Sequence, residues 1–313
     1  MDLVFCGTPE FAVPTLKKLV EAGHNVRLVV TQPDRPSGRG QELAAPAVKR
    51  LAQSLGLPVV QPDKIKNNQE FRAQLEALNP EAIIVVGYGR IIPKWMIDLP
   101  RDSNINLHGS LLPKYRGAAP IQWAIARGET VTGVTTMRID EGLDTGDILL
   151  QREMPIDPED TAVTLAPRLA EMGAELMLET LPGLEAATIQ PRKQDHTEAT
   201  LAPILKKEDG RIAFNREAPE ILNRLRGFQP WPGAFTSFRG KNLTLHRARL
   251  AAYGMGPLVP GEMKAAGEDL FLGCGEGTAL QVLELQPEGK RRMSAKDFVH
   301  GYRPKAGERL GDW

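Results

Sequence analysis

The sequence predicts an α/β protein, with a doubly wound, mostly parallel sheet in its first part and a small β-barrel in its last third. Two observations support this fold class. Apolar runs alternate with amphipathic stretches through the first half of the 313 residues, which is the pattern of parallel βαβ units. Beyond about residue 230, short alternating runs are separated by glycines, which is typical of a small barrel.

The elements of the first half follow one another as strand and helix. Gly23 and Gly56 come directly after two of the amphipathic stretches and are stop signals for helices. The predicted strands are residues 3–6, 26–31, 82–87 and 105–108, and the predicted helices lie near residues 15–22, 47–55 and 69–78.

Two later strands and a long helix complete this part of the chain. Residues 134–139 and 148–153 are the predicted strands. Residues 161–181 form the helical pattern, for which Asp160 or Thr161 is the expected N-cap. Pro167 lies inside this pattern, and because proline removes a helical hydrogen bond, the first turns are expected to end or kink there.

A polar, proline-containing stretch from residue 187 to 205 predicts a linker. It divides the chain into a domain of residues 1–186 and a domain of residues 206–313, and a chain of this length is long enough for two domains. In the second domain we expect a helix at residues 219–228, followed by strands at residues 234–238, 243–250, 270–272 and 279–286.

The charge is unevenly distributed although the net charge is zero. Residues 1–205 carry 21 Lys and Arg against 26 Asp and Glu, whereas residues 206–313 carry 18 against 13. A basic domain joined to an acidic one favours a polyanionic partner for the basic end. The imbalance is modest, so an ordinary solvated surface is the alternative.

The sequence argues against several other classes of protein. No basic segment followed by a long apolar run opens the chain, so neither a signal peptide nor a membrane span is expected. Cys6 and Cys274 lie far apart and fit a reduced cytoplasm. The glycine pairs at residues 38–40 and 87–89 lack the third glycine of a dinucleotide fingerprint, and the five scattered histidines indicate no metal site.

The stretch NLHGSLLP, from Asn106 to Pro113, joins two reactive polar side chains to a tight turn. Asn106 and His108 are two residues apart on a predicted strand, so both side chains point to the same side. They lie at the carboxyl end of the strand, where open α/β sheets place their ligands. An amide donor and an imidazole suit a developing oxyanion and a moving proton. The alternative is that both side chains only satisfy the backbone of a loop.

A second polar group lies in the acidic turn that follows residues 134–139. Asp144 stands between Gly142 and Gly146, in a segment too irregular to be a helix face. A carboxylate held there could orient or stabilise an imidazole. Acidic turns are common, so a solvated loop is the alternative for this residue alone.

Together these residues resemble the folate-dependent formyltransferases, on the set Asn106, His108, Ser110, Leu111, Leu112, Pro113 and Asp144. Further motifs narrow the resemblance to the family of methionyl-tRNA formyltransferases, and they span nearly the whole chain in the expected order. These motifs are FCGTP at residues 5–9, TQPDRP at 31–36 with GRG at 38–40, RGAAPIQ at 116–122, PWP at 230–232 and LQPEGK at 285–290.

The resemblance implies a Rossmann-like formyltransferase domain followed by an OB-like barrel that contacts tRNA. The implied reaction moves a formyl group from 10-formyltetrahydrofolate to the α-amine of methionine on initiator methionyl-tRNA, giving N-formylmethionyl-tRNA for translation initiation. Asn106 and His108 would act on the developing oxyanion and the proton, and Asp144 would keep His108 charged and oriented. No metal takes part, and we expect a cytoplasmic monomer.

The resemblance also implies binding residues. Ser110, Leu111, Leu112 and Pro113 would form a loop beside the folate, and the backbone near Arg90, Ile92 and Asp140 would edge its pteridine. Arg39, in the basic segment 34–40, would reach the acceptor end of the tRNA, since arginine can grip phosphate or stack on a base. Lys206 and Lys207 would neutralise phosphates. Trp231 is expected to be a packed aromatic rather than a base-stacking one.

Three alternatives stay open. Relatives with the same catalytic trio formylate a ribonucleotide amine or an amino sugar, but a small acceptor requires neither a basic second domain nor the segment around Arg39. A formyl-folate hydrolase would use water in place of an amine. A non-catalytic tRNA-binding protein is the third alternative, and the joint presence of Asn106, His108 and Asp144 argues against it.

Overall fold

The computed structural model describes residues 1–37, 42–100, 103–252 and 258–311. By contacts the chain forms two compact units. The first unit comprises residues 1–120, 131–155 and 165–203, and the second comprises residues 121–130, 156–164 and 204–313. Among the described residues, none of the helices combines the length and the apolar character that crossing a membrane requires.

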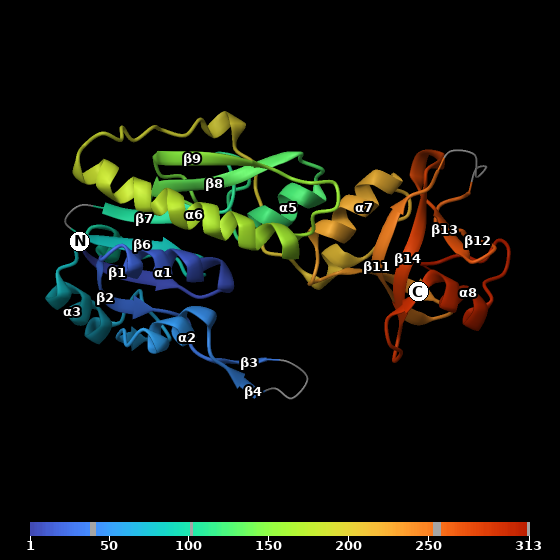
Figure 1. The fold of residues 1–313 in the computed structure, drawn as a ribbon, viewed down its shortest axis with the longest axis horizontal. Helices are drawn as coiled ribbons and strands as arrows, with labels where there is room; N and C mark the ends of the chain where they lie inside the picture. Colours follow the sequence, from blue (N-terminus) through green and yellow to red (C-terminus); the bar gives the residue numbers. More distant parts are fainter. Residues whose placement is uncertain (38–41, 101–102, 253–257, 312–313) are drawn as a thin grey trace. The chain divides into compact units, whose positions relative to one another are not determined.

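A seven-stranded sheet forms the centre of the first unit (Figure 1), with the strand order β5-β2-β1-β6-β7-β8-β9. The five strands from β5 to β7 pair in parallel, whereas β8 runs antiparallel to both of its neighbours. The predicted doubly wound, mostly parallel sheet is therefore confirmed. The bounds are β1 Asp2–Gly7, β2 Asn25–Val30, β5 Val59–Val60, β6 Ala82–Val86, β7 Ser103–His108, β8 Val131–Arg138 and β9 Ile148–Pro155.

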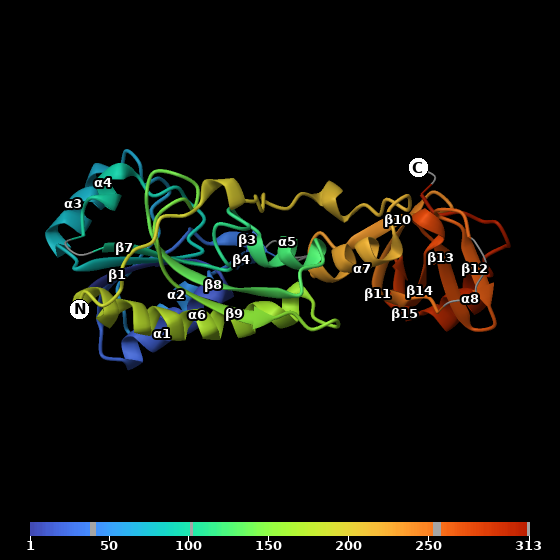
Figure 2. The same cartoon turned by 90° about the horizontal axis from the view of Figure 1, so that it is seen from above.

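Helices cover both faces of this sheet. Figure 2 shows α1, α2 and α6 on one side of the strands and α3 and α4 on the other. The helix α3 begins at Asn68, whose side chain accepts a hydrogen bond from the Phe71 amide at 3.0 Å, and it buries Phe71 and Leu75 one turn apart. The bounds are α1 Val13–Glu21, preceded by the 3₁₀ turn Glu10–Ala12, then α2 Ala47–Ser54, α3 Gln69–Leu78, α4 Lys94–Ile97 and α6 Ala162–Glu185.

The long helix α6 differs from its prediction at Pro167. Thr161 is the N-cap, since its hydroxyl accepts a hydrogen bond from the Thr164 amide at 3.3 Å. The helix does not end at Pro167 but continues to Glu185. Packing explains this, because one missing hydrogen bond is offset by close contact with the sheet. A side chain at Gly173 would lie only 2.7 Å from Leu107 of β7, so the backbone of α6 approaches that strand closely.

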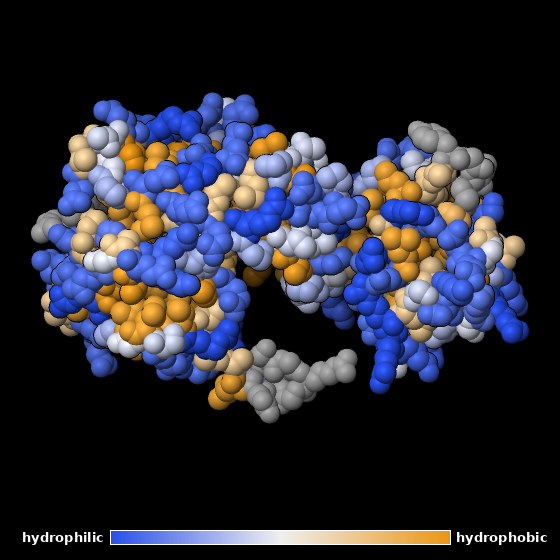
Figure 3. All heavy atoms as spheres, in the orientation of Figure 1, coloured by the Kyte–Doolittle hydropathy of each residue, from blue (hydrophilic) through white to orange (hydrophobic). Residues whose placement is uncertain are grey.

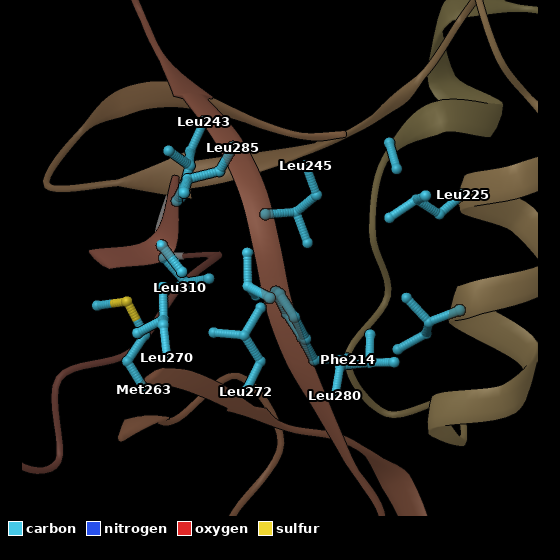
Figure 4. Packing of buried hydrophobic residues seen from close by; sticks show 14 of the residues in the cluster. Phe214, Leu225, Leu243, Leu245, Met263, Leu270, Leu272, Leu280, Leu285 and Leu310 are labelled. Carbon is cyan, nitrogen blue, oxygen red and sulfur yellow. The ribbon is translucent and has the colours of Figure 1, made fainter. Parts of the chain in front are cut away.

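The second unit is built on one antiparallel sheet, with the order β10-β11-β14-β13-β12 and with β15 paired to β14. This confirms the predicted C-terminal β domain, although β12, β15 and α8 were not predicted from the sequence. Its core is dominated by leucines that project between the strands and α7 (Figure 4). The bounds are α5 Pro120–Ala126, α7 Ala218–Gly227, β10 Ala234–Phe238, β11 Lys241–Leu250, β12 Met263–Ala266, β13 Asp269–Gly273, β14 Ala279–Pro287, β15 Met293–Ser294 and α8 Ala295–Tyr302, with 3₁₀ turns at Lys207–Gly210 and Gly275–Gly277. A further 3₁₀ turn, His196–Glu198, belongs to the first unit.

Two short strands follow β2. Strand β3 (Arg35–Ser37) pairs antiparallel with β4 (Glu42–Ala44), and this pair is here called the β3–β4 hairpin. Arg39 lies outside the described residues. The face of the molecule shown in Figure 3 is mostly hydrophilic, and its hydrophobic side chains form separate patches.

Candidate active site

Strand β7 presents three polar side chains on one face of the sheet. Asn104, Asn106 and His108 alternate along the strand, so they point the same way. The amide of Asn104 donates to the carbonyls of Met96 and Ile97 at 2.9 and 2.5 Å, which places this face on the side of α4. His108 ends the strand beside the carboxyl end of β6, next to the switch point between β1 and β6 where open α/β sheets bind ligands.

His108 is buried and held from two sides. Its Nε2 lies 2.8 Å from the carbonyl oxygen of Tyr115, and because a carbonyl only accepts, this nitrogen must carry a hydrogen. Its Nδ1 lies 3.7 Å from Oδ2 of Asp144, which is too long for a hydrogen bond but within ion-pair distance of a protonated ring. The contact with Tyr115 therefore leaves Nδ1 available for proton exchange next to a carboxylate.

Asp144 is not a solvated turn residue. Its side chain is only 18% exposed, and Oδ2 accepts a hydrogen bond from the Gly117 amide at 2.8 Å. Its φ of 51° is left-handed, a conformation that a residue other than glycine adopts only when neighbouring contacts hold it. The turn closes tightly, since a side chain at Gly146 would collide with the carbonyl oxygen of Arg138.

Unlike the side chain of Asn104, the side-chain amide of Asn106 is not occupied by any described residue and can bind a ligand. It is half-buried, opposite Val85 of β6 and Met137 of β8. Its side chain makes no hydrogen bond to any residue that the structure describes. Asn104, by contrast, is buried and donates to two carbonyls. Asn106 is therefore the amide on this face with a free donor for a ligand.

The loop Ser110, Leu111, Leu112 and Pro113 is anchored to β8 rather than mobile. Thr135 donates from its hydroxyl to the carbonyl oxygen of Ser110 at 2.6 Å and accepts from the amide of Leu112 at 3.2 Å. Leu112 is buried in a small cluster with Met137 and Ile148. The loop thus gives a fixed edge beside His108, with the side chain of Leu112 committed to the core.

The residues expected to edge the pteridine lie on two loops that meet. Ile92 is buried in the apolar cluster that also contains Val85, and Ile139 packs against this cluster from the loop after β8. Arg90 is tied down by a 2.5 Å hydrogen bond from Nη1 to the carbonyl oxygen of Asp63. The Asp140 side chain is exposed and accepts from the Gly142 amide and the Thr145 hydroxyl, so it shapes the turn that carries Asp144.

Polar contacts that the sequence did not predict fix the base of the β3–β4 hairpin. The Asp34 carboxylate pairs with Lys49 at 2.8 Å and accepts from Gln61, and these hydrogen bonds lower the pKa of Asp34. The amide of Gln32 donates to the carbonyls of Tyr88 and Gly89 at 3.0 and 3.1 Å. The hairpin base is therefore joined directly to the loop after β6. The motif TQPDRP could be recognised in the sequence, but its hydrogen bonds with Lys49 and Gln61 could not be predicted from it.

The residues expected to bind tRNA in the second unit are exposed. Lys206 and Lys207 both present their side chains to solvent, and the Lys206 amide is tied to the Asp209 carboxylate at 2.7 Å. The expectation for Trp231 was wrong, because this side chain is 53% exposed rather than packed. In the described ranges, no group of three or more His, Cys, Asp or Glu side chains could hold a metal ion.

Comparison with known proteins connects this geometry to a family. The family model described as formyl transferase matches residues 1–181, and the formyl transferase C-terminal domain matches residues 204–303. A methionyl-tRNA formyltransferase of Koribacter versatilis is 68% identical, over 99% of both chains. The chain belongs to the methionyl-tRNA formyltransferase family. The methionyl-tRNA formyltransferase of Acidobacterium capsulatum is 66% identical, over 99% of this chain and 100% of that one.

A solved structure shares the fold of this family member at low sequence identity. It is the N-formyltransferase from Helicobacter canadensis in complex with folinic acid and dTDP-3-aminofucose, with a TM-score of 0.67 and 20% identity over 91% of this chain and 98% of that one. The likeness shows that this protein shares the fold of the Helicobacter canadensis enzyme. A shared fold does not by itself determine the substrate.

Proposed function

We propose that this methionyl-tRNA formyltransferase family member moves the formyl group of 10-formyltetrahydrofolate to the α-amine of methionine on initiator methionyl-tRNA. The observation that carries the proposal is the convergence of Asn106, His108 and Asp144 at the end of β7, in a chain 68% identical to a methionyl-tRNA formyltransferase. The donor supplies an electrophilic formyl carbon, and the residues of the chain supply positioning, charge stabilisation and proton transfer.

Asn106 would stabilise the oxygen of the formyl group as the amine attacks. The attack places negative charge on this oxygen in a tetrahedral species, and an amide N–H can donate to it without changing its own charge. Because the side chain is otherwise unpartnered among the described residues, no existing hydrogen bond has to break. One such donor is typically worth about 2.7–4 kcal/mol in the transition state.

His108 and Asp144 would manage the protons. The incoming amine must lose a proton and the departing N10 of the folate must gain one. His108 keeps Nδ1 free because Nε2 is occupied by the Tyr115 carbonyl, so Nδ1 is the atom that exchanges protons with the reacting groups. Asp144 lies 3.7 Å away and would stabilise the charged ring and orient it.

The surrounding elements would bind the two substrates. We infer that the backbone near Arg90, Ile92 and Asp140, together with the loop Ser110, Leu111, Leu112 and Pro113, holds the folate. Peptide groups on the two meeting loops can read a flat heterocycle by direct hydrogen bonds. We also infer a catalytic domain at residues 1–186, a linker at 187–205 and a tRNA-binding domain at 206–313.

The compartment and the oligomeric state belong to the same proposal. Cys6 and Cys274 are free, buried thiols, which suits the reducing cytoplasm where initiator tRNA is used. We infer a monomer. Light scattering coupled to size-exclusion chromatography tests this inference, and a mass near twice 34.3 kDa would contradict it.

One assay tests the proposed reaction directly. The purified protein is given 10-formyltetrahydrofolate with methionylated initiator tRNA, methionylated elongator tRNA, an amino sugar nucleotide or no acceptor. Formylation of the initiator tRNA in strong preference to the others is the expected result. Formylation of the sugar amine alone, or folate hydrolysis without an acceptor, would replace the proposal with one of its rivals.

The segment around Arg39 gives a prediction about tRNA use. Replacing Arg39 by alanine should lower kcat/KM for initiator methionyl-tRNA about tenfold or more, because one charged hydrogen bond is worth roughly 1.5–3 kcal/mol. The KM for the folate should not change. Steady-state kinetics with each substrate varied in turn measure both effects, with Arg50→Ala, a substitution of an exposed arginine, as the control. Unaltered tRNA kinetics would leave Arg39 without a role.

The exposed lysines give a prediction about salt. If Lys206 and Lys207 contact phosphates, tRNA affinity should fall steeply with salt, and the double alanine variant should reduce the slope of log K against log salt by about 1–2. Filter binding from 50 to 200 mM salt measures the slope. Lys264→Ala, on β12, is the matched surface control. An equal slope in the variant and the wild type would contradict the assignment.

A further inference from the structure

A segment expected to be a plain linker is bonded to the site residues. Residues 192–202, here called the strap, lie along the segment that follows His108. The Arg116 amide donates to the carbonyl of Thr200 at 2.8 Å, and the Ala202 amide donates back to the carbonyl of Arg116 at 2.7 Å. The hydroxyl of Thr200 accepts from the Tyr115 amide at 2.9 Å. The strap therefore fixes Tyr115, whose carbonyl contacts His108, and Arg116, which directly precedes the Gly117 amide that contacts Asp144.

Gln194 is the strap residue that reaches the turn of Asp144. Its side chain is buried, with 6% of the residue exposed. Its Nε2 donates to the carbonyl oxygens of Asp144 and Gly146, at 2.9 and 2.7 Å. Its Oε1 accepts two hydrogen bonds from Arg116, from Nε at 3.1 Å and from Nη2 at 2.7 Å. A primary amide has two N–H donors and two acceptor lone pairs, and here all four are used.

Arg116 determines which way the Gln194 amide faces. A guanidinium can only donate, so the oxygen of the amide must face Arg116 and its N–H groups must face the two carbonyls. Arg116 is itself 7% exposed, and its remaining contact is to His196 Nδ1 at 3.1 Å. Among the described residues it forms no ion pair with a carboxylate. The buried, charged guanidinium of Arg116 thus donates to the neutral amide of Gln194. Buried arginines are usually paired with a carboxylate, so this contact indicates that the orientation of the amide matters.

The orientation matters because Asp144 has a strained backbone. Its left-handed φ is maintained by contacts at both ends, from Gln194 to its carbonyl and from the Gly117 amide to its carboxylate. Gly117 directly follows Arg116 in the chain. These two adjacent residues therefore take part in both contacts with Asp144, Arg116 through Gln194 and Gly117 directly. The carboxylate attached in this way lies 3.7 Å from Nδ1 of His108.

We propose that Gln194, oriented by Arg116, is a positioning residue that holds the Asp144 carboxylate in register with His108. The proposal rests on the catalytic role given above to Asp144. It gives the strap a function in the active site. It also predicts that substitution of Gln194 lowers kcat without weakening the binding of either substrate.

Two substitutions test the positioning role. Gln194→Ala removes the amide, and Gln194→Glu keeps its shape and its Arg116 partner but replaces the two donors with an oxygen that repels the carbonyls. Both should lower kcat about 10²-fold, because a displacement of about 1 Å in a catalytic group has this effect, while KM for tRNA and for folate stays within about threefold. Lys193→Ala, the exposed neighbour on the strap, should leave kcat unchanged.

A double-substitution cycle separates positioning from general damage. In an Asp144→Ala background, Gln194→Ala should cause no further loss of kcat, because the residue it positions is gone. Near-ultraviolet circular dichroism and thermal unfolding confirm that each variant is folded, and Gln194→Glu serves if the alanine variant is not. Losses that multiply, or a Gln194 variant within threefold of wild type, would overturn the proposal. A near-normal Asp144→Ala rate would instead overturn the proposed function of the site, so the two failures are distinguishable.

Discussion

Replacement of His108 by alanine is expected to lower kcat for formyl transfer about 10²–10⁴-fold, the usual contribution of a positioned proton-transfer group. An imidazole can act both as an acceptor and as a donor of a proton, which the reaction requires. The affinity for tRNA should change little, since the ring is buried and only 6% exposed. Single-turnover kinetics with saturating folate measure the chemical step, and filter binding measures the affinity for tRNA.

A matched control tests whether the loss is specific to this imidazole. His24 is a second histidine of the first unit, at the opposite end of the parallel strands, where burial lowers its pKa. His24→Ala should keep a wild-type rate. If His108→Ala also retains most of the rate, the ring is not part of the mechanism and the contact with Tyr115 is merely structural. If both variants lose activity, the loss reflects stability and not chemistry.

The fold class followed from the sequence because the buried strands carry continuous apolar runs. Each of β1, β2, β6 and β7 begins within two residues of its prediction. The clearest cases are β1 and β6, which are almost entirely apolar and buried, as parallel strands covered on both faces tend to be, whereas β7 alternates polar and apolar residues. The short strands β3, β4 and β12 and the helix α8 were not identified. In α8, Phe298 packs against Phe238, with ring centres 5.2 Å apart, but the helix has only eight residues and follows a basic cluster. Local pattern is weak in such short elements.

The candidate site was accessible to sequence reasoning only in part. Alternation along a strand is a local rule, so it places Asn106 and His108 on one face without any knowledge of tertiary structure. The approach of Asp144 to His108 depends on irregular backbone, and the residues alone left it open. Gln194 was hidden for the same reason, because a polar segment has the same composition whether its side chains face water or, as here, a buried hydrogen-bond network.

Local sequence patterns also do not predict which segments belong to each of the two compact units. Residues 121–130 and 156–164 group with the second unit although they lie within the predicted first domain, residues 1–186. Trp123 of the first of these segments stacks edge-on against Phe228, with ring centres 5.2 Å apart. Such contacts between distant parts of the sequence leave no periodic pattern. A domain boundary predicted from composition therefore does not take them into account.

Replacement of Asn106 by aspartate is expected to lower kcat about 10²–10³-fold, the range found when one oxyanion donor is lost, with the larger value favoured by the added negative charge. The side chain keeps its shape, so binding of either substrate should be only mildly affected. The substituted oxygen would face the oxygen that becomes negative as the amine attacks, so repulsion replaces a hydrogen bond in the transition state.

Asn104 provides a matched control for this prediction, because it is the same residue type on the same strand and the same face of the sheet. The Nδ2 group of its amide donates to the Met96 and Ile97 carbonyls, so Asn104→Ala should lower the free energy of unfolding by about 1–3 kcal/mol and leave kcat of the folded enzyme unchanged. Chemical denaturation and steady-state kinetics on both variants give the comparison. An Asn106→Asp enzyme with a near-normal kcat, or an Asn104→Ala enzyme that folds normally but turns over slowly, would mean that the amide acting on the substrate is not Asn106.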